Sequence, residues 1–193
     1  METGEERIAD AKRKARQRAR EIRDGMTPAE IAEASRQITQ KVLALPQFRE
    51  ARVIMSYVSM DREPDTRDII RAAEAEGKQV LIPRCADRTH MEAAAFQGFE
   101  QLIPGRMGIP EPQAGTPAAE GAEPDLILIP CVAATRDGKR MGHGAGYYDR
   151  FLAERPGKRV CLCFQKLLMS DLPTGEYDIR MDLVLTDGQE ERT

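Results

Sequence analysis

The chain has 193 residues, of which 41% are hydrophobic and 32% charged, and its formal net charge is −3. This length suits one compact domain over residues 1–193, and the composition excludes a chain that is disordered throughout. The small negative charge disfavours wholesale nucleic-acid binding, and no apolar run approaches the roughly 20 residues that span a bilayer. The charged start lacks the apolar core of a secretory signal, so we expect a cytoplasmic protein.

The first predicted helix is strongly basic. Apolar residues from Ile8 to Ile22 repeat at helical spacing, while residues 12–23 carry seven bases and one acid. One interpretation is a solvated helix face. The other is ligand contact, because Lys12 and Arg16 stand four residues apart and could bind adjacent oxygens of a polyphosphate. No aromatic residues are interleaved with these bases, which disfavours a nucleic-acid surface.

A second helix is expected to begin with Thr27 as N-cap, with Pro28 and Glu30 completing its start, and to end at Pro46. The run 53–58 predicts a strand, residues 66–76 a helix capped by Asp65, and residues 80–82 another strand. This order is the strand–helix–strand unit of parallel sheets. A short strand follows at residues 91–96, and residues 110–124 are predicted to form a surface loop.

The second half of the chain supplies three more strands. Residues 125–130 form a continuous apolar run, typical of a strand covered on both faces, and residues 159–164 and 183–185 resemble it. The fold class is therefore α/β, with three layers, α/β/α, around a mostly parallel sheet. The cysteines lack a CxxC pair and lie largely in apolar runs, which favours buried thiols over disulfides or zinc for Cys85, Cys131, Cys161 and Cys163.

The segment DGKRMGHGAGYYDRF, residues 137–151, follows a buried strand and leads into a predicted helix. Gly142, Gly144 and Gly146 let the backbone approach an anion closely, which indicates a phosphate cradle, although a plain turn explains the same spacing. Lys139 and Arg140 add positive charge that suits phosphate.

Three acids are candidates for the same site. Asp149 falls in the first turn of the helix, where it either complements the helix dipole or binds Mg²⁺ beside phosphates. Asp182 begins the last strand and is either a second magnesium ligand or an ordinary strand-edge acid. Glu63 follows the strand 53–58 and is either solvated, or accepts hydrogen bonds from a pterin or positions a reacting amide.

These motifs resemble those of the 5-formyltetrahydrofolate cyclo-ligases, also called methenyltetrahydrofolate synthetases. The resemblance runs from Lys12 to Thr186, and its most specific part joins the strand 125–130 to GKRMGHGAGYYDRFL. The segments KRKAR, YVSMDREPDT, LIPR, GIPEP and RMDLVLT appear around it in the family's order. The family's fold is similar to that of ribose-phosphate isomerases and CoA transferases.

The resemblance implies a ligase of one-carbon metabolism that closes 5-formyltetrahydrofolate to 5,10-methenyltetrahydrofolate, with ATP as co-substrate and Mg²⁺ as cofactor. The formyl oxygen is phosphorylated, and ADP and phosphate are released. Arg140 and Lys12 are implied as catalytic, Glu63, Met107 and Tyr148 as folate-binding, and Asp149 and Asp182 as metal ligands. The implied ATP-binding residues are Lys12, Arg16, Arg140, Gly142, His143, Gly144, Ala145, Gly146, Tyr147 and Tyr148.

Three positions depart from the family's usual pattern. His143 stands where tyrosine or arginine is common, Ala145 where glycine or lysine is common, and Met107 where some members have an aromatic residue against the folate. We expect a monomer with small-molecule substrates and without nucleic-acid or membrane partners. The alternatives are a phosphate-ester-binding isomerase of the same fold and a non-catalytic folate- or nucleotide-binding paralogue.

Overall fold

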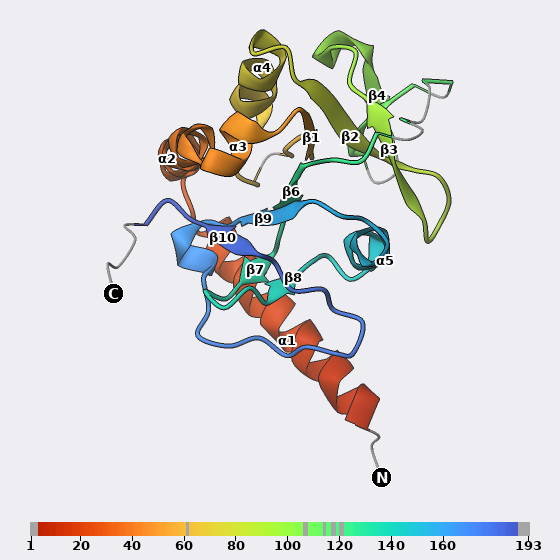
Figure 1. Cartoon of the computed structure of the whole chain (residues 1–193). Helices are drawn as coiled ribbons and strands as arrows, with labels where there is room; N and C mark the ends of the chain where they lie inside the picture. The colour runs from red at the N-terminus through yellow and green to blue at the C-terminus, as the bar shows by residue number, and fades with distance from the viewer. Residues whose placement is uncertain are drawn as a thin grey trace.

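The structure is a computed structural model that describes residues 4–60, 62–105, 108–113, 115–116, 119 and 122–188. A six-stranded sheet lies at its centre (Figure 1), built from β1 (Val53–Ser56), β2 (Gln79–Cys85), β3 (Met91–Ala95), β6 (Leu126–Pro130), β9 (Lys158–Leu162) and β10 (Leu183–Leu185). The strand order is β10-β9-β6-β1-β2-β3. Only the β2–β3 pair is antiparallel, which confirms the predicted mostly parallel sheet.

Helices cover both faces of this sheet. The helices are α1 (Gly4–Asp24), α2 (Pro28–Ala44), α3 (Pro46–Glu50), α4 (Arg67–Ala75) and α5 (Tyr147–Ala153). Figure 1 shows α2, α3 and α4 grouped on one side of the sheet, with α1 and α5 on the other. The predicted capping box of α2 is present, since Thr27 and Glu30 bond reciprocally. Short 3₁₀ turns occur at Phe99–Gln101 and Gln165–Leu167. Among the described residues, no helix has the length and apolar character needed to cross a membrane.

Two further strand pairs lie outside the main sheet. β4 (Leu102–Pro104) pairs with β5 (Pro110–Pro112), and β7 (Ala133–Ala134) pairs with β8 (Arg140–Met141). The prediction that residues 110–124 form a loop was therefore wrong at its start. Prolines are tolerated in β5 because it is a short edge strand with β4 as its neighbour.

The ends of the central strands differ slightly from the predicted ones. β1 stops at Ser56, because Tyr57 and Val58 leave the ladder to line a cavity. β2 runs three residues further than expected, to Cys85. The pairing of β2 with β1 ends at Met55 and Leu81, and from there on β2 pairs only with β3. Pro83, which has no N–H, therefore removes no hydrogen bond to β1.

Two aspartates fix the amino ends of neighbouring parallel strands. Asp125, just before β6, accepts hydrogen bonds through Oδ2 from the N–H groups of Arg52 at 2.8 Å and Val53 at 2.9 Å. Asp182, just before β10, accepts one through Oδ2 from the N–H of Arg159 at 2.7 Å. The sequences Asp-Leu-Ile-Leu and Asp-Leu-Val-Leu thus start their strands in the same way.

The strand order creates a crevice at the carboxyl ends of the strands, opposite the ends that these aspartates fix. From β1 the chain moves outward to β2 and β3, then returns to β6 on the other side of β1 and continues to β9 and β10. Connections therefore diverge at the carboxyl ends of β1 and β6, the switch point where open α/β sheets bind ligands. The core beneath is formed by the buried strands, and it includes the buried thiols of Cys131, Cys161 and Cys163, as predicted, whereas Cys85 is only partly buried.

Candidate functional site

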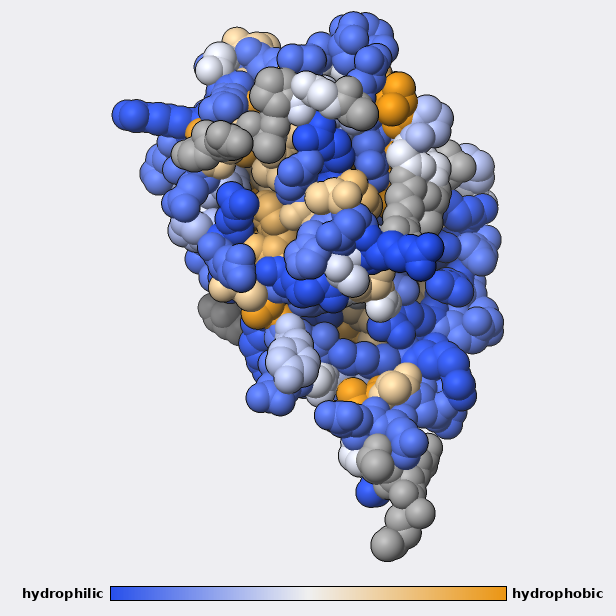
Figure 2. Space-filling model, turned by 90° about the vertical axis from the view of Figure 1, so that its right-hand side faces the viewer, coloured by the Kyte–Doolittle hydropathy of each residue, from blue (hydrophilic) through white to orange (hydrophobic). Residues whose placement is uncertain are grey.

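A cavity of about 810 Å³ opens at this switch point. Its walls include Tyr57 and Val58 after β1, Pro83 in β2 and Pro130 at the end of β6. Figure 2 shows a hollow with an apolar floor surrounded by hydrophilic residues. Single-ligand pockets span roughly 300–1,000 Å³, so this volume lies in the upper part of the range.

Most of the predicted site residues meet in this cavity. The residues that line it include Lys12, Arg16, Glu63, Arg140, Gly142, His143, Gly144, Ala145, Gly146, Tyr147, Tyr148 and Asp149. Met107 lies outside the described residues. Asp182 does not line the cavity, because its carboxylate is bound at the amino ends of β9 and β10, at the far edge of the sheet. The placement of Asp182 beside Asp149 was therefore wrong.

The glycine-rich loop is held against helix α1. Gly144 and Gly146 have φ angles of 108° and 69°, a left-handed conformation that favours glycine. The Nε of Arg16 donates a hydrogen bond to the carbonyl of Gly142 at 2.9 Å, and a Cβ at Gly144 would lie 3.4 Å from the Arg16 guanidinium carbon. One basic residue of α1 thus fixes the loop, and the positive φ of Gly144 disfavours any other residue there.

Arg140 and Asp149 form a largely buried ion pair in the wall of the cavity. Nη2 of Arg140 lies 3.0 Å from both carboxylate oxygens of Asp149, and the two side chains are 4% and 19% exposed. The Arg140 guanidinium also stands over the ring of Tyr148, 5.6 Å from its centroid. The Asp149 carboxylate therefore fixes the orientation of the Arg140 guanidinium in the cavity, which suits binding of an anionic substrate.

A second acid lies beside this pair, and it is not one that sequence reasoning selected. Nζ of Lys12 lies 2.5 Å from Oδ2 of Asp178, which also accepts from the N–H of Gly175 at 2.7 Å. The next residue, Ile179, donates its N–H to Oδ1 of Asp149 at 3.3 Å. Asp178 therefore occupies the place beside Asp149 that the sequence analysis had given to Asp182.

One signal in the sequence separates these two acids. Asp182 immediately precedes a strand, as Asp125 does, and the start of a parallel strand lies at the edge of the sheet opposite the ligand site. Asp178 is four residues further from that strand, in an irregular segment that can return to the site.

Glu63 contacts the glycine-rich loop across the cavity. Its Oε2 accepts from the N–H of Met60 at 3.0 Å, and its Oε1 lies 3.7 Å from Nε2 of His143. Burial raises the pKa of Tyr57 and of Tyr148, and the negative charge of Glu63 raises both further. A carboxylate beside two neutral phenols forms a polar, aromatic wall that suits a planar heterocycle.

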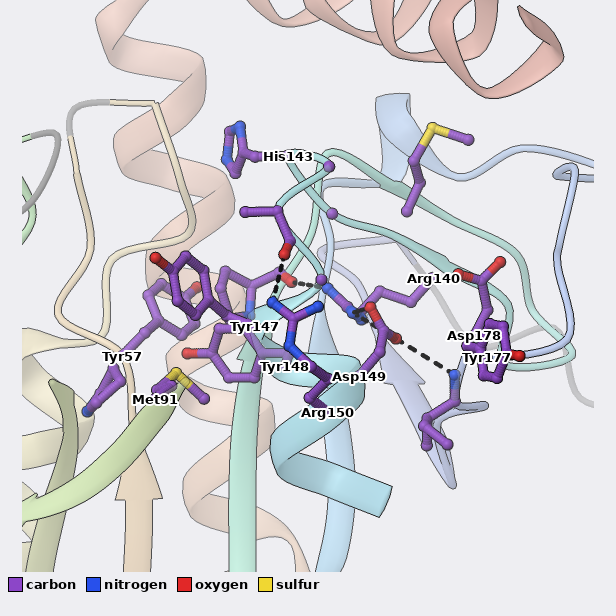
Figure 3. Close-up of a pocket in the computed structure, with 18 of the residues that line it drawn as sticks. Tyr57, Met91, Arg140, His143, Tyr147, Tyr148, Asp149, Arg150, Tyr177 and Asp178 are labelled. Atoms are coloured by element: carbon purple, nitrogen blue, oxygen red, sulfur yellow. Dashed lines mark hydrogen bonds and ion pairs between the residues drawn. The ribbon is translucent and has the colours of Figure 1, made fainter. Parts of the chain in front are cut away.

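Figure 3 shows how these groups are spread along the cavity. Tyr57 and Met91 lie at one side, Tyr177 and Asp178 at the other, and Arg140 and Asp149 between them. The aromatic wall and the rim around Tyr177 are therefore separate ends of one cavity, with the charged groups in the middle.

Comparison with known proteins identifies the family. The model of the 5-formyltetrahydrofolate cyclo-ligase family matches residues 8–187. The chain belongs to this family. It is 30% identical to the probable 5-formyltetrahydrofolate cyclo-ligase of Caenorhabditis elegans, over 94% of this chain and 95% of the relative. It is 29% identical to the 5-formyltetrahydrofolate cyclo-ligase of Mus musculus, over 92% of this chain and 94% of the relative.

Solved structures of cyclo-ligase relatives share the fold. The 5,10-methenyltetrahydrofolate synthetase of Aquifex aeolicus matches with a TM-score of 0.78 at 24% identity, covering 94% of this chain and 95% of that one. The enzyme of the same name from Mycoplasma pneumoniae matches with a TM-score of 0.74 at 20% identity, covering 92% and 99%. The α/β fold predicted from the sequence is thus the fold of these proteins.

Proposed function

We propose that this cyclo-ligase family member converts 5-formyltetrahydrofolate and ATP to 5,10-methenyltetrahydrofolate, ADP and phosphate. The observation that carries the proposal is that the family match spans residues 8–187 and that the basic, glycine-rich and acidic segments of that span converge on one cavity. The family match favours this ligase over a phosphate-ester isomerase. The volume of the cavity, near the upper end for ligand pockets, suits two substrates held together.

The charged middle of the cavity and its aromatic end suit the two substrates. The triphosphate would lie along the glycine-rich loop, where Lys12, Arg16 and Arg140 bring positive charge from α1 and β8. The pterin would lie against the wall formed by Glu63 and Tyr148, because a carboxylate accepts hydrogen bonds from the amide and amino N–H groups of that ring. The formyl oxygen would then face the γ-phosphate.

The reaction needs no nucleophile from the protein. The formyl oxygen attacks the γ-phosphorus as ADP leaves, and N10 of the folate then adds to the activated formyl carbon. Loss of phosphate and of the N10 proton leaves the methenyl bridge. Lys12 and Arg140 stabilise the charge on the transferring phosphoryl group, and the fixed orientation of both substrates supplies much of the rate enhancement.

Magnesium fits this site as an ion that is bound together with ATP. Mg²⁺ is commonly held by one or two carboxylates and by substrate phosphates, and it neutralises phosphate charge. The described residues contain no cluster of three or more potential metal ligands, which disfavours a metal cage built by the protein alone. We assign the two carboxylates to Asp149 and Asp178, because Ile179, the residue after Asp178, donates its N–H to Asp149.

One assay tests the reaction directly. Purified protein is mixed with ATP, Mg²⁺ and 5-formyltetrahydrofolate, and the near-ultraviolet absorbance of the methenyl product is followed together with ADP release. We expect both products to appear in equal amounts and only when all three components are present. ADP release without methenyl product would refute the folate reaction. We also propose a monomer in the cytoplasm, a compartment that suits the buried thiols of Cys131, Cys161 and Cys163.

A further inference from the structure

Tyr177 exposes its side chain at the rim of the cavity. It is 82% exposed, far more than the other exposed large hydrophobic residues of the described chain, of which Ile103 is the next at 42%. A single exposed aromatic residue is ordinary on a protein surface. This one also lines the cavity, so it is placed where it can contact a ligand.

The backbone around Tyr177 is held by polar contacts. Oδ2 of Asp178 accepts hydrogen bonds from Nζ of Lys12 at 2.5 Å and from the N–H of Gly175 at 2.7 Å. The N–H of Asp178 donates to the carbonyl of Gly175 at 3.3 Å. The residue after Tyr177 is thus tied both to its own turn and to helix α1, which fixes the backbone that carries Tyr177.

The position of the ring along the cavity decides which ligand it can meet. Figure 3 places Tyr177 on one side of Arg140 and Asp149, and Tyr57, Tyr148 and Met91 on the other. If the γ-phosphate lies near Arg140 and the pterin beyond it at Tyr148, the remainder of the nucleotide must extend the other way. That direction leads to Tyr177 and Asp178, the second of which binds Lys12.

We propose that Tyr177 is a stacking platform for the purine base of ATP, a role that rests on the proposed function. Every base has a π-face, and stacking on an aromatic ring does not require a particular sequence of hydrogen bonds. Pro173 and Ile179 line the same cavity and are only partly buried, so they can cover the edge of a base. The platform therefore binds a purine base without distinguishing strongly between purines.

Calorimetric titration with two ligands, ATP and inorganic tripolyphosphate, both with Mg²⁺, isolates the base. Tyr177→Ala should weaken ATP binding by about 5- to 150-fold, the range that one stacked base supplies, and change tripolyphosphate binding less than about twofold. Tyr177→Phe keeps the ring and should keep the ATP affinity. Thr174→Ala, an exposed residue of the same segment that does not line the cavity, is the matched control and should change neither.

Two results would refute the role of Tyr177 as a stacking platform. One is an unchanged affinity of Tyr177→Ala for ATP. The other is an equal loss of affinity for ATP and for tripolyphosphate, which would mean that the substitution had altered the whole segment and not only removed the ring. If the wild type binds neither ligand, the proposed function and the platform both fail. If Tyr177→Ala selectively weakens ATP while the wild type forms no methenyl product, the platform stands and the folate reaction fails.

Discussion

Replacing Asp149 by alanine should destabilise the protein strongly. The guanidinium of Arg140 is 4% exposed and Asp149 is 19% exposed, so the substitution leaves a nearly buried cation without its carboxylate. Removing one member of a buried pair costs about 3–5 kcal/mol. Because Asp149 is partly exposed and water can enter the space it leaves, we expect the lower limit, about 3 kcal/mol. For a chain of this size that corresponds to a fall in Tm of about 6–12 °C.

Urea denaturation followed by circular dichroism measures this loss, with thermal unfolding as the second readout. The matched control is Asp68→Ala, which breaks an ion pair on α4 whose two side chains are 61% and 77% exposed, and which should cost less than about 1 kcal/mol. A loss for Asp149→Ala no larger than for Asp68→Ala would refute the reasoning. A double variant, Arg140→Met with Asp149→Leu, should recover part of the stability, because no charge is then left buried.

Three further substitutions separate binding from stability. Glu63→Gln should raise the KM for 5-formyltetrahydrofolate about tenfold or more and change the KM for ATP little, because it removes one charged hydrogen-bond acceptor. Steady-state kinetics that show an unchanged KM for the folate would exclude Glu63 from the folate site. Asp182→Asn should leave turnover unchanged and lower stability by about 1 kcal/mol, discounted because its side chain is 37% exposed. Lost turnover at an unchanged Tm would instead return Asp182 to the active site. Thr27→Ala removes the α2 cap and should cost about 1 kcal/mol in urea titrations, with both KM values unaffected.

The central sheet could be predicted because its strands are continuous apolar runs. Leu126 to Ile129 are fully buried, and such a run fits a parallel strand covered on both faces. The β4–β5 pair could not be predicted, because Pro110–Pro112 has no strand propensity and is held in place by its neighbour. The short helix α3 was missed for a related reason: Pro46 marks the end of one helix and also begins the next.

The candidate site could be predicted where one segment carries the signal. The loop from Gly142 to Gly146 combines glycines with neighbouring bases, so its place at the cavity followed from local sequence. Asp178 was harder to choose, because both acids lie in the same short segment and the one signal that separates them is that Asp182 directly precedes a strand. Their contacts in the folded chain, to Lys12 for Asp178 and to Arg159 for Asp182, make the difference plain.

The contact between Lys12 and Asp178 joins residues that are 166 positions apart. A growing chain can therefore complete this wall of the cavity only after nearly all of its residues have been made, and an unfolded or half-made chain offers the nucleotide no comparable site. Ligand that binds only the finished fold shifts the folding equilibrium toward it by mass action.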